Sequence, residues 1–422
     1  MRKIKKLIAV FLSLALIASA ATGCSNDSAE SEDFASIVTD ISEISIPAGT
    51  KIIGFGEATH GNKELQELKK DVFKSIMESY DTKTFILEGD FGGCERVNEY
   101  IHGGNGTAEA AAAEIGFAIY RTAEMADLIE WMKNYNQTVS ESDMISFYGC
   151  DMQRVDNNKE LLLDYLAKTS HDLYNEYSGV FSDVTDDTIY NISSSVYKDI
   201  ESKMDKLTDE MEKHKEEMID ASSLSEFKKA CKEINIITQM CQLQSASNLS
   251  YSKIRDKFMA ENVEWILDYE DENGRGSVFL SGHNGHIEKC SANSAGYTSL
   301  GNHLKDKYGS AYFAIGTDIL NSTFSCYSNF KDERIEFTVT NKNPLTSKMQ
   351  YVEQNTVYLD VKAAENSDLN NIITGKVKML NVGDSFESFQ QYFSMFYTIS
   401  MTPNESYDGI ILIKDASPSK IK

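Results

Sequence analysis

A carboxylate and an imidazole stand three residues apart, directly after a short apolar segment. Residues 51–55, Lys-Ile-Ile-Gly-Phe, predict a buried strand that ends in a tight turn, and Glu57 and His60 follow it. Ligands bind beyond the carboxyl ends of strands in open α/β sheets, so we expect both side chains to face a site. A histidine accepts and returns a proton near neutral pH, and a nearby carboxylate fixes its tautomer. The pair therefore indicates activation of a water molecule.

Four further segments predict buried strands that end in polar residues. They are residues 84–87, 144–148, 277–280 and 311–315. The residues that follow them are Glu88, then Asp151, then His283 and His286, then Thr317 and Asp318. A parallel sheet would bring all of these residues to one edge. Three of the seven histidines fall in such positions, which histidines scattered over a surface would not do.

The residue types of this edge suit hydrolysis by water. We expect His60 to act as the general base, with Glu57 or Glu88 to orient it. His283 and His286 would polarise a carbonyl or hold its developing negative charge. No Gly-x-Ser-x-Gly elbow occurs in the chain, which favours direct attack by water over an acyl-enzyme.

Two other functions use the same residues. His283 and His286 have a His-x-x-His spacing, so the Glu/His set could hold a metal in a metal-dependent enzyme or a metal-binding protein. The same edge could also bind a ligand without turnover, as in a non-catalytic surface binding protein.

The elements that position these residues predict an α/β fold. Strands alternate with helices such as residues 63–80, which favours a central, largely parallel sheet flanked by helices. Residues 157–268 differ, since they are highly charged and almost entirely helical in pattern. Apolar residues from Val196 to Met211 recur at steps of three and four, which predicts a long helical hairpin inserted into the α/β domain.

The N-terminus resembles a bacterial lipoprotein signal. Four basic residues precede an apolar run, and Ala21-Thr22-Gly23-Cys24 closes it, so we expect residues 1–23 to be removed and Cys24 to carry lipid. Residues 24–46 would form a tether and a short helix over 34–46, and residues 47–422 the hydrolase domain. The predicted location is the extracytoplasmic face of the cell membrane, through a lipid anchor.

Composition excludes some partners. The formal net charge of −24 would repel nucleic acid, so we expect none to bind. The cysteines are scattered singly, without a Cys-x-x-Cys pair, which argues against a disulfide scaffold or a cysteine metal site.

Several segments together resemble the erythromycin esterase family. They are residues 54–61 (Gly-Phe-Gly-Glu-Ala-Thr-His-Gly), 87–90 with 96–98, 131–136, 147–152, 255–262, 282–286 and 407–410, with Pro418. The resemblance spans residues 47–420 in the family's order.

What the resemblance implies is a hydrolase that opens a macrolide lactone, or another small-molecule ester, by water attack. His60 matches the family's general base, Glu57 and Glu88 its essential carboxylates, and His283 and His286 its later histidines. Lys69 stands where the family can carry an arginine, and these residues differ in hydrogen-bonding geometry. We expect Lys69, Asp151 and Arg96 to contact the substrate. No cofactor is required, although a divalent metal stays open, and a cell-envelope metabolite fits as well as erythromycin.

Overall fold

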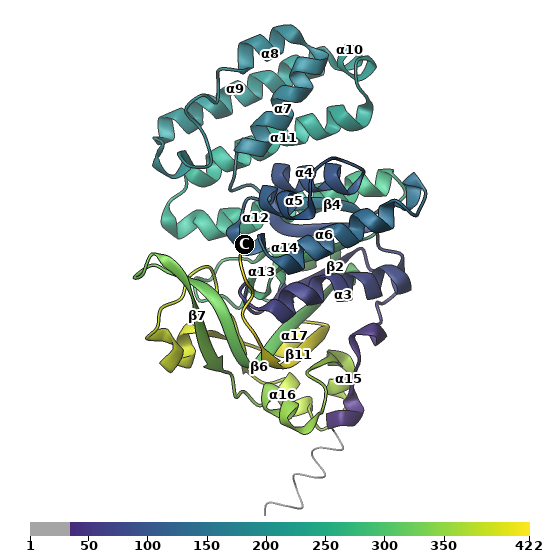
Figure 1. Cartoon of the computed structure of the whole chain (residues 1–422), viewed down its shortest axis with the longest axis vertical. Coiled ribbons are helices and arrows are strands. Elements are labelled where there is room, and N and C mark those ends of the chain that lie inside the picture. The colour runs from purple at the N-terminus through teal and green to yellow at the C-terminus, as the bar shows by residue number, and fades with distance from the viewer. Residues whose placement is uncertain (1–33) are drawn as a thin grey trace, which may run out of the picture.

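The computed structural model describes residues 34–422, which form a mixed sheet covered by helices on both faces (Figure 1). The predicted signal segment 1–23 and Cys24 lie outside the described residues. Within the described part, the main sheet has nine strands in the order β1-β8-β11-β6-β2-β5-β3-β4, and β7 pairs with β6.

The strands predicted from the sequence form the parallel centre of this sheet. They are β2 (Ile52–Glu57), β3 (Thr84–Asp90), β4 (Ser146–Asp151), β5 (Val278–His283) and β6 (Tyr312–Ser328), with β11 (Gly409–Ala416) beside β6. Antiparallel strands lie outside them: β1 (Val38–Thr39), β7 (Glu333–Thr340) and β8 (Thr356–Asp360). A separate pair joins β9 (Val377–Leu380) to β10 (Thr398–Met401). The predicted α/β class with a largely parallel sheet is confirmed.

Alternate residues of each central strand enter two different cores. Ile53 of β2 and Phe85 of β3 pack in the core on one face, whereas Ile52 and Ile86 pack in the core on the other face. This follows from the period of two in a strand, and burial on both faces explains why these strands read as continuous apolar runs.

Helices of the flanking layers cover these two faces. One core includes residues of α3 (Lys63–Tyr80), α4 (Phe91–Ile101), α5 (Ala108–Glu114) and α6 (Ala123–Asn136). The other includes residues of α12 (Asn248–Glu272), α13 (Asn284–Ile287) and α14 (Leu300–Tyr308). The predicted helix over residues 63–80 is found with the same bounds.

The helical insertion lies beyond the sheet, at the top of Figure 1, and has a core of its own. Its helices are α7 (Asp156–Thr169), α8 (His171–Tyr177), α9 (Ser194–Lys213), α10 (Lys215–Asp220) and α11 (Leu224–Gln244). Four residues of the predicted seam pack inward, since Ile200, Met204, Leu207 and Met211 are all buried, but the first, Val196, is 38% exposed. Helices α9 and α11 form the expected hairpin, while α7 and α8 pack beside them and make the insertion a small bundle. The prediction that the insertion extends to residue 268 differs from the structure, because α12 packs in a core of the sheet.

The segment before the first central strand differs from the prediction of one helix over 34–46. Only residues 34–37 are helical there, Val38–Thr39 pairs with β8, and Ile41–Glu43 forms a short 3-10 turn. Apolar spacing alone predicts the helix, but the open edge of β8 offers Val38 a strand partner. Among the described residues, no helix combines the length and apolar character needed to cross a membrane.

Candidate active site

Charged side chains gather at the carboxyl ends of β2, β3, β4 and β5. Glu57 ends β2 directly opposite His283, which ends the neighbouring strand β5. Glu88 lies in β3 and Asp151 ends β4. The parallel register therefore places Glu57 beside His283, although 226 positions separate them in the sequence. This is the convergence at one sheet edge that the strand pattern predicts.

Glu57 holds a different partner on each carboxylate oxygen. Its Oε2 accepts a hydrogen bond from Lys69 Nζ at 2.6 Å, and both side chains are fully buried. Its Oε1 lies 3.7 Å from His60 Nδ1, a charge contact longer than a hydrogen bond, and neither atom has another hydrogen-bond partner. Gln66 donates to the His60 carbonyl at 3.1 Å and accepts from Lys69 at 2.9 Å. Lys69 and Gln66 thus fix Glu57 beside the imidazole.

The electrostatics of this pair suit a proton acceptor that is held close to its working range. Burial acts to lower the pKa of His60, but Glu57 and Glu88 outweigh it and raise that pKa above its ordinary value. Burial acts to raise the pKa of Glu57, yet Lys69 and His60 hold it below its usual value. In the described part of the chain no hydrogen bond engages Nε2 of His60, so this nitrogen is free to accept a proton.

Glu88 accepts two hydrogen bonds and faces a third group as an ion pair, and it lies at the centre of the cluster. Its Oε2 accepts from the His283 backbone N–H at 2.7 Å, and its Oε1 from Arg255 Nη2 at 2.7 Å. His286 Nε2 approaches the same Oε1 at 3.2 Å. Burial acts to raise the pKa of Glu88, but His286 and Arg255 hold it well below its usual range. Glu88 is therefore ionised and already fully engaged.

Arg255 joins two strand ends through its guanidinium group. Its Nη2 donates to Asp151 Oδ2 at 2.6 Å as well as to Glu88, and its Nε reaches the same Asp151 oxygen at 3.1 Å. Its Nη1 lies 3.1 Å from His286 Nε2. When His286 is protonated this last contact joins two donors, so the Nη1 hydrogens then have no acceptor there.

His286 is held as a cation between two carboxylates. Its Nδ1 lies 3.0 Å from the Asp256 carboxylate and its Nε2 faces Glu88. Burial acts to lower the pKa of His286, but Asp256 and Glu88 outweigh it and raise it to about 10. At neutral pH this side chain therefore supplies a fixed positive charge rather than a proton acceptor.

His283 has the opposite protonation state. Its Nε2 donates to the Val382 carbonyl at 3.0 Å, and its Nδ1 accepts from the Gly285 backbone N–H at 3.2 Å. Burial, followed by the charge of His60, lowers the pKa of His283 to about 4. Its ring lies 5.0 Å from that of His60, measured between centroids. Both ring nitrogens of this neutral histidine are hydrogen-bonded to backbone groups. His283 therefore packs beside His60 without a free nitrogen of its own.

The charges of the cluster favour protonation of His60. Among its described members, the cations are Lys69, Arg255 and His286, and the carboxylates are Glu57, Glu88, Asp151 and Asp256. A proton accepted from water by His60 would balance this surplus negative charge. The arrangement therefore stabilises the imidazolium that forms when a base activates water.

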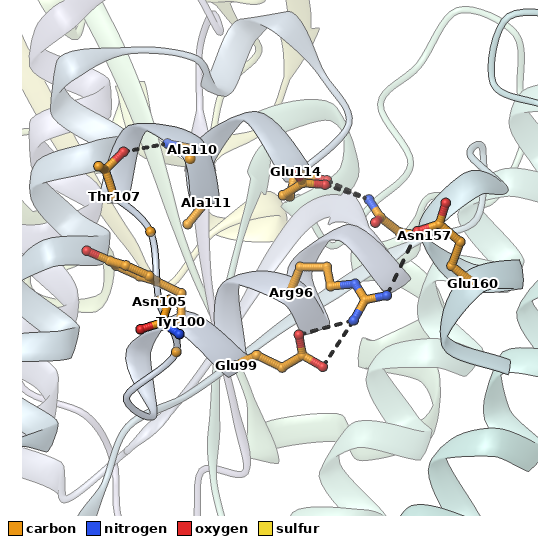
Figure 2. Close-up of a pocket in the computed structure, with 12 residues that line it drawn as sticks. Arg96, Glu99, Tyr100, Asn105, Thr107, Ala110, Ala111, Glu114, Asn157 and Glu160 are labelled. Atoms are coloured by element: carbon orange, nitrogen blue, oxygen red, sulfur yellow. Dashed lines mark hydrogen bonds and ion pairs between the residues drawn. The ribbon is translucent and has the colours of Figure 1, made fainter. Parts of the chain in front are cut away.

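The residues expected to contact substrate lie in different surroundings. Lys69 is fully buried behind Glu57, and Asp151 is fully buried against Arg255. Arg96 instead pairs with Glu99, Asp164 and Glu160. It lines a surface pocket of about 410 Å³, and Figure 2 shows its contacts with Glu99 and Glu160 there. That pocket is lined by residues of α4, the loop that follows it, α5 and α7, and it includes no member of the charged cluster. Arg96 therefore lies apart from the site.

Sequence patterns did not single out four residues that complete the cluster. Arg255 and Asp256 come from α12, Gln66 from α3, and Tyr120 donates to the Glu88 carbonyl at 3.0 Å. Nothing in the spacing of a helix predicts that it returns to a sheet edge. The only signal for Arg255 and Asp256 was their place in a segment that resembles the family.

The same geometry bears on metal binding. In the part of the chain that the structure describes, no three His, Cys, Asp or Glu side chains are grouped as ligands for a metal ion. The reason is visible in the pairing, because Glu88, Asp151 and Asp256 each face a cationic side chain. The six described cysteines are all free.

Fold and site together define an α/β protein with a Glu/His cluster at the carboxyl edge of its sheet. A family model described as erythromycin esterase matches residues 77–416. The chain belongs to the erythromycin esterase family. Glu57 and His60 precede the matched residues. A relative from Escherichia coli, erythromycin esterase type II, is 23% identical over 403 residues, covering 88% of this chain and 91% of that protein.

Solved structures share the fold at low sequence identity. A Bacillus cereus protein has a TM-score of 0.78 at 18% identity, covering 94% of this chain and 99% of its own. A protein described as a succinoglycan biosynthesis protein has a TM-score of 0.77 at 19% identity, covering 95% and 100%. A mutant of the erythromycin esterase EreC in its open conformation has a TM-score of 0.63 at 15% identity, covering 89% and 93%.

Proposed function

We propose that this protein hydrolyses an ester or lactone with His60 as the base that activates water. The observation that carries the proposal is the chain Lys69–Glu57–His60, in which one carboxylate oxygen is fixed by Lys69 and the other faces His60 Nδ1. Water on the Nε2 side would give its proton to His60 as it attacks the carbonyl carbon. Glu57 would stabilise the imidazolium until the proton passes to the leaving oxygen.

The developing negative charge needs a donor or a positive field. We infer that Arg255 supplies it, because its Nη1 hydrogens have no acceptor at His286 once that ring is protonated. The fixed positive charge of His286, whose Nε2 lies 3.1 Å from Arg255 Nη1, adds to this field. The expectation that His283 and His286 donate directly to the carbonyl stays a prediction, and in this arrangement the ring nitrogens of His283 are bound to backbone groups.

Family membership suggests the substrate class. Two of the similar proteins, the Escherichia coli relative and EreC, are named erythromycin esterases, so a macrolide lactone is the first substrate to test. We also propose that Cys24 is lipidated and displays the enzyme outside the membrane. An envelope or secreted ester then becomes an equally suitable substrate, since such an enzyme meets compounds before they reach the cell interior.

A hydrolysis screen tests the proposal. The protein beginning at Ser25 is incubated with macrolides and a panel of esters, with and without chelator, beside His60→Asn and the control His171→Asn. His171 is an exposed histidine of the insertion. We expect chelator-resistant hydrolysis that His60→Asn lowers by about 10²–10⁴-fold and His171→Asn leaves unchanged. Loss to chelator with recovery on added metal would favour a metal-dependent enzyme, and tight binding without turnover a binding protein.

A further inference from the structure

Six large apolar side chains are exposed together beside the site, and we call them the aromatic patch. They are Phe330, Phe389, Tyr392, Phe393, Met395 and Phe396, with exposed fractions from 40% to 81%. Phe330 lies at the turn between β6 and β7, and the others come from the loop of residues 382–396. Phe330 stacks on Phe389 at 6.5 Å between centroids, and Phe396 meets both Phe389 and Phe393 edge-on. Four of the rings thus form one exposed apolar cluster, and Tyr392 and Met395 belong to the same short loop.

The loop that carries the patch starts and ends beside the charged cluster. The Asn381 backbone N–H donates to the Tyr397 carbonyl at 2.9 Å, which closes the loop at its base. The carbonyl of Val382 accepts from His283, and its N–H donates to the Ala58 carbonyl. Compact loops with joined ends are often functional. In Figure 1 the β6–β7 hairpin projects from the sheet on the side of this loop.

The patch is uncharged, although the protein is strongly acidic. Residues 388–404 contain no Asp, Glu, Lys or Arg, in a chain of which 25% is charged. Of the acidic residues at its border, Glu387 is buried and bound internally, since it accepts from Ser328 Oγ at 2.7 Å and from the Phe330 N–H at 3.1 Å. Asp332, which accepts from Tyr327, and Asp384 are exposed at the edge. Charge therefore lies at the border of the patch, and the loop segment that carries five of its six side chains has none.

We propose that the aromatic patch docks the catalytic domain onto a lipid bilayer. Rings that are up to 81% exposed do not wall a recess, so the patch fits a broad apolar surface better than a small ligand. Aromatic rings with polar neighbours such as Gln390 and Ser394 suit the boundary between acyl chains and headgroups. The predicted lipid anchor at Cys24 favours a bilayer over a protein partner. Only ten residues lead from Cys24 to Phe34, and ten residues extend at most about 35 Å, so a lipidated Cys24 would hold the described domain close to a membrane.

Docking would set the site at the membrane surface. The loop that enters the bilayer is the one whose first residue holds His283, so esters dissolved in or crossing the membrane would reach the cluster first. The proposal does not depend on ester hydrolysis, because vesicle binding is measured without any substrate.

Vesicle sedimentation tests the proposal with the protein beginning at Ser25, which lacks the anchor and keeps every described element. The vesicles are phosphatidylcholine alone or with added phosphatidylglycerol. Serine replaces four residues in one variant: Phe330, Tyr392, Phe393 and Met395. The matched control is Leu249→Ser, since Leu249 is fully exposed on α12 and outside the patch. We expect the parent and the control to sediment alike, and the fourfold variant to bind at least about tenfold more weakly.

Two further readouts keep the outcome decisive. Phe393→Trp should shift its fluorescence to shorter wavelength on vesicles and be quenched by brominated phosphatidylcholine. Parent protein that stays in the supernatant, a fourfold variant that binds like the parent, or an unshifted tryptophan would overturn the proposal. So would sedimentation velocity that shows a dimer dissolved by the fourfold variant without vesicle binding, because the patch would then join two copies of this chain.

Discussion

The charge of His286 gives a prediction that can be worked out from two contacts. Its ring lies 3.0 Å from Asp256 and 3.2 Å from Glu88, and its pKa is raised to about 10 against an ordinary value of 6.5. Asp256→Asn removes one of the two carboxylates. It keeps an oxygen that can accept from the Leu300 N–H, which Asp256 holds at 3.0 Å, so the start of α14 is preserved.

The magnitude follows from linkage between protonation and folding. A carboxylate at this range shifts a neighbouring pKa by about 1–3 units, and each unit is worth about 1.4 kcal/mol. Because the ring keeps 15% exposure, solvent screening favours the lower part of that range, so we expect a loss of about 2 kcal/mol. Because the pKa of His286 is higher in the folded than in the unfolded protein, its protonation stabilises the fold. This stabilisation is complete below pH 6.5 and is lost as the pH rises through about 10.

Unfolding in urea at pH 6 and at pH 10 tests this reasoning. The free energy of unfolding of Asp256→Asn should lie below that of the wild type at pH 6, and the gap should shrink at pH 10. Asp127→Asn is the control. The Asp127 carboxylate, which pairs with Lys70, is 65% exposed, so its loss should change the free energy of unfolding by less than about 0.5 kcal/mol. Ring titration by NMR gives the pKa directly. A wild-type His286 that titrates near pH 6.5, or a gap independent of pH, would refute the assignment.

Three further changes test other contacts of the site. Lys69→Met should lower the free energy of unfolding, measured in urea, by about 3–5 kcal/mol, because Glu57 is left buried without its cation. The double variant Lys69→Met with Glu57→Gln should recover much of that loss. Two losses that simply add would contradict the pairing. Arg255→Lys should lower kcat/KM by at least about tenfold, since an ammonium group cannot bridge Asp151 and Glu88 as the guanidinium does, and unchanged kinetics would exclude that role. Gly61→Ala should unfold or strongly destabilise the chain, because a Cβ there would lie 2.0 Å from the Ser325 carbonyl oxygen, whereas Gly179→Ala meets nothing within 4 Å and should leave the melting temperature unchanged.

Much of the fold could be predicted because the central strands carry strong local signals. Ile52 and Ile53, for example, are both buried since the two faces of the sheet are covered, which gives a continuous apolar run. Polar residues after such runs then share one edge, and this placed Glu57, His60 and Glu88 correctly. The helix over 34–46 failed because strand pairing at Val38 depends on β8, more than 300 residues away, and local spacing does not report it.

The partners of the site residues could not be predicted from local pattern. Lys69 was expected to touch substrate, but the α3 turn on which it lies points it at Glu57. Arg96 was expected at the site, yet it follows the edge by one and a half turns of α4 and faces acidic side chains of α4 and α7. The state of each histidine depends on which groups surround it, so His283 and His286 take opposite charges although only three positions separate them.

The pH dependence of kcat/KM for the wild type and Glu57→Gln tests the central claim most directly, that His60 is a base held by Glu57. This profile reports the pKa of the free enzyme's essential base. Because Glu57 helps to raise the pKa of His60, we predict a wild-type acid limb above pH 6.5 that moves to lower pH in Glu57→Gln, with a lower plateau. An acid limb that stays in place with an unchanged plateau would contradict the account.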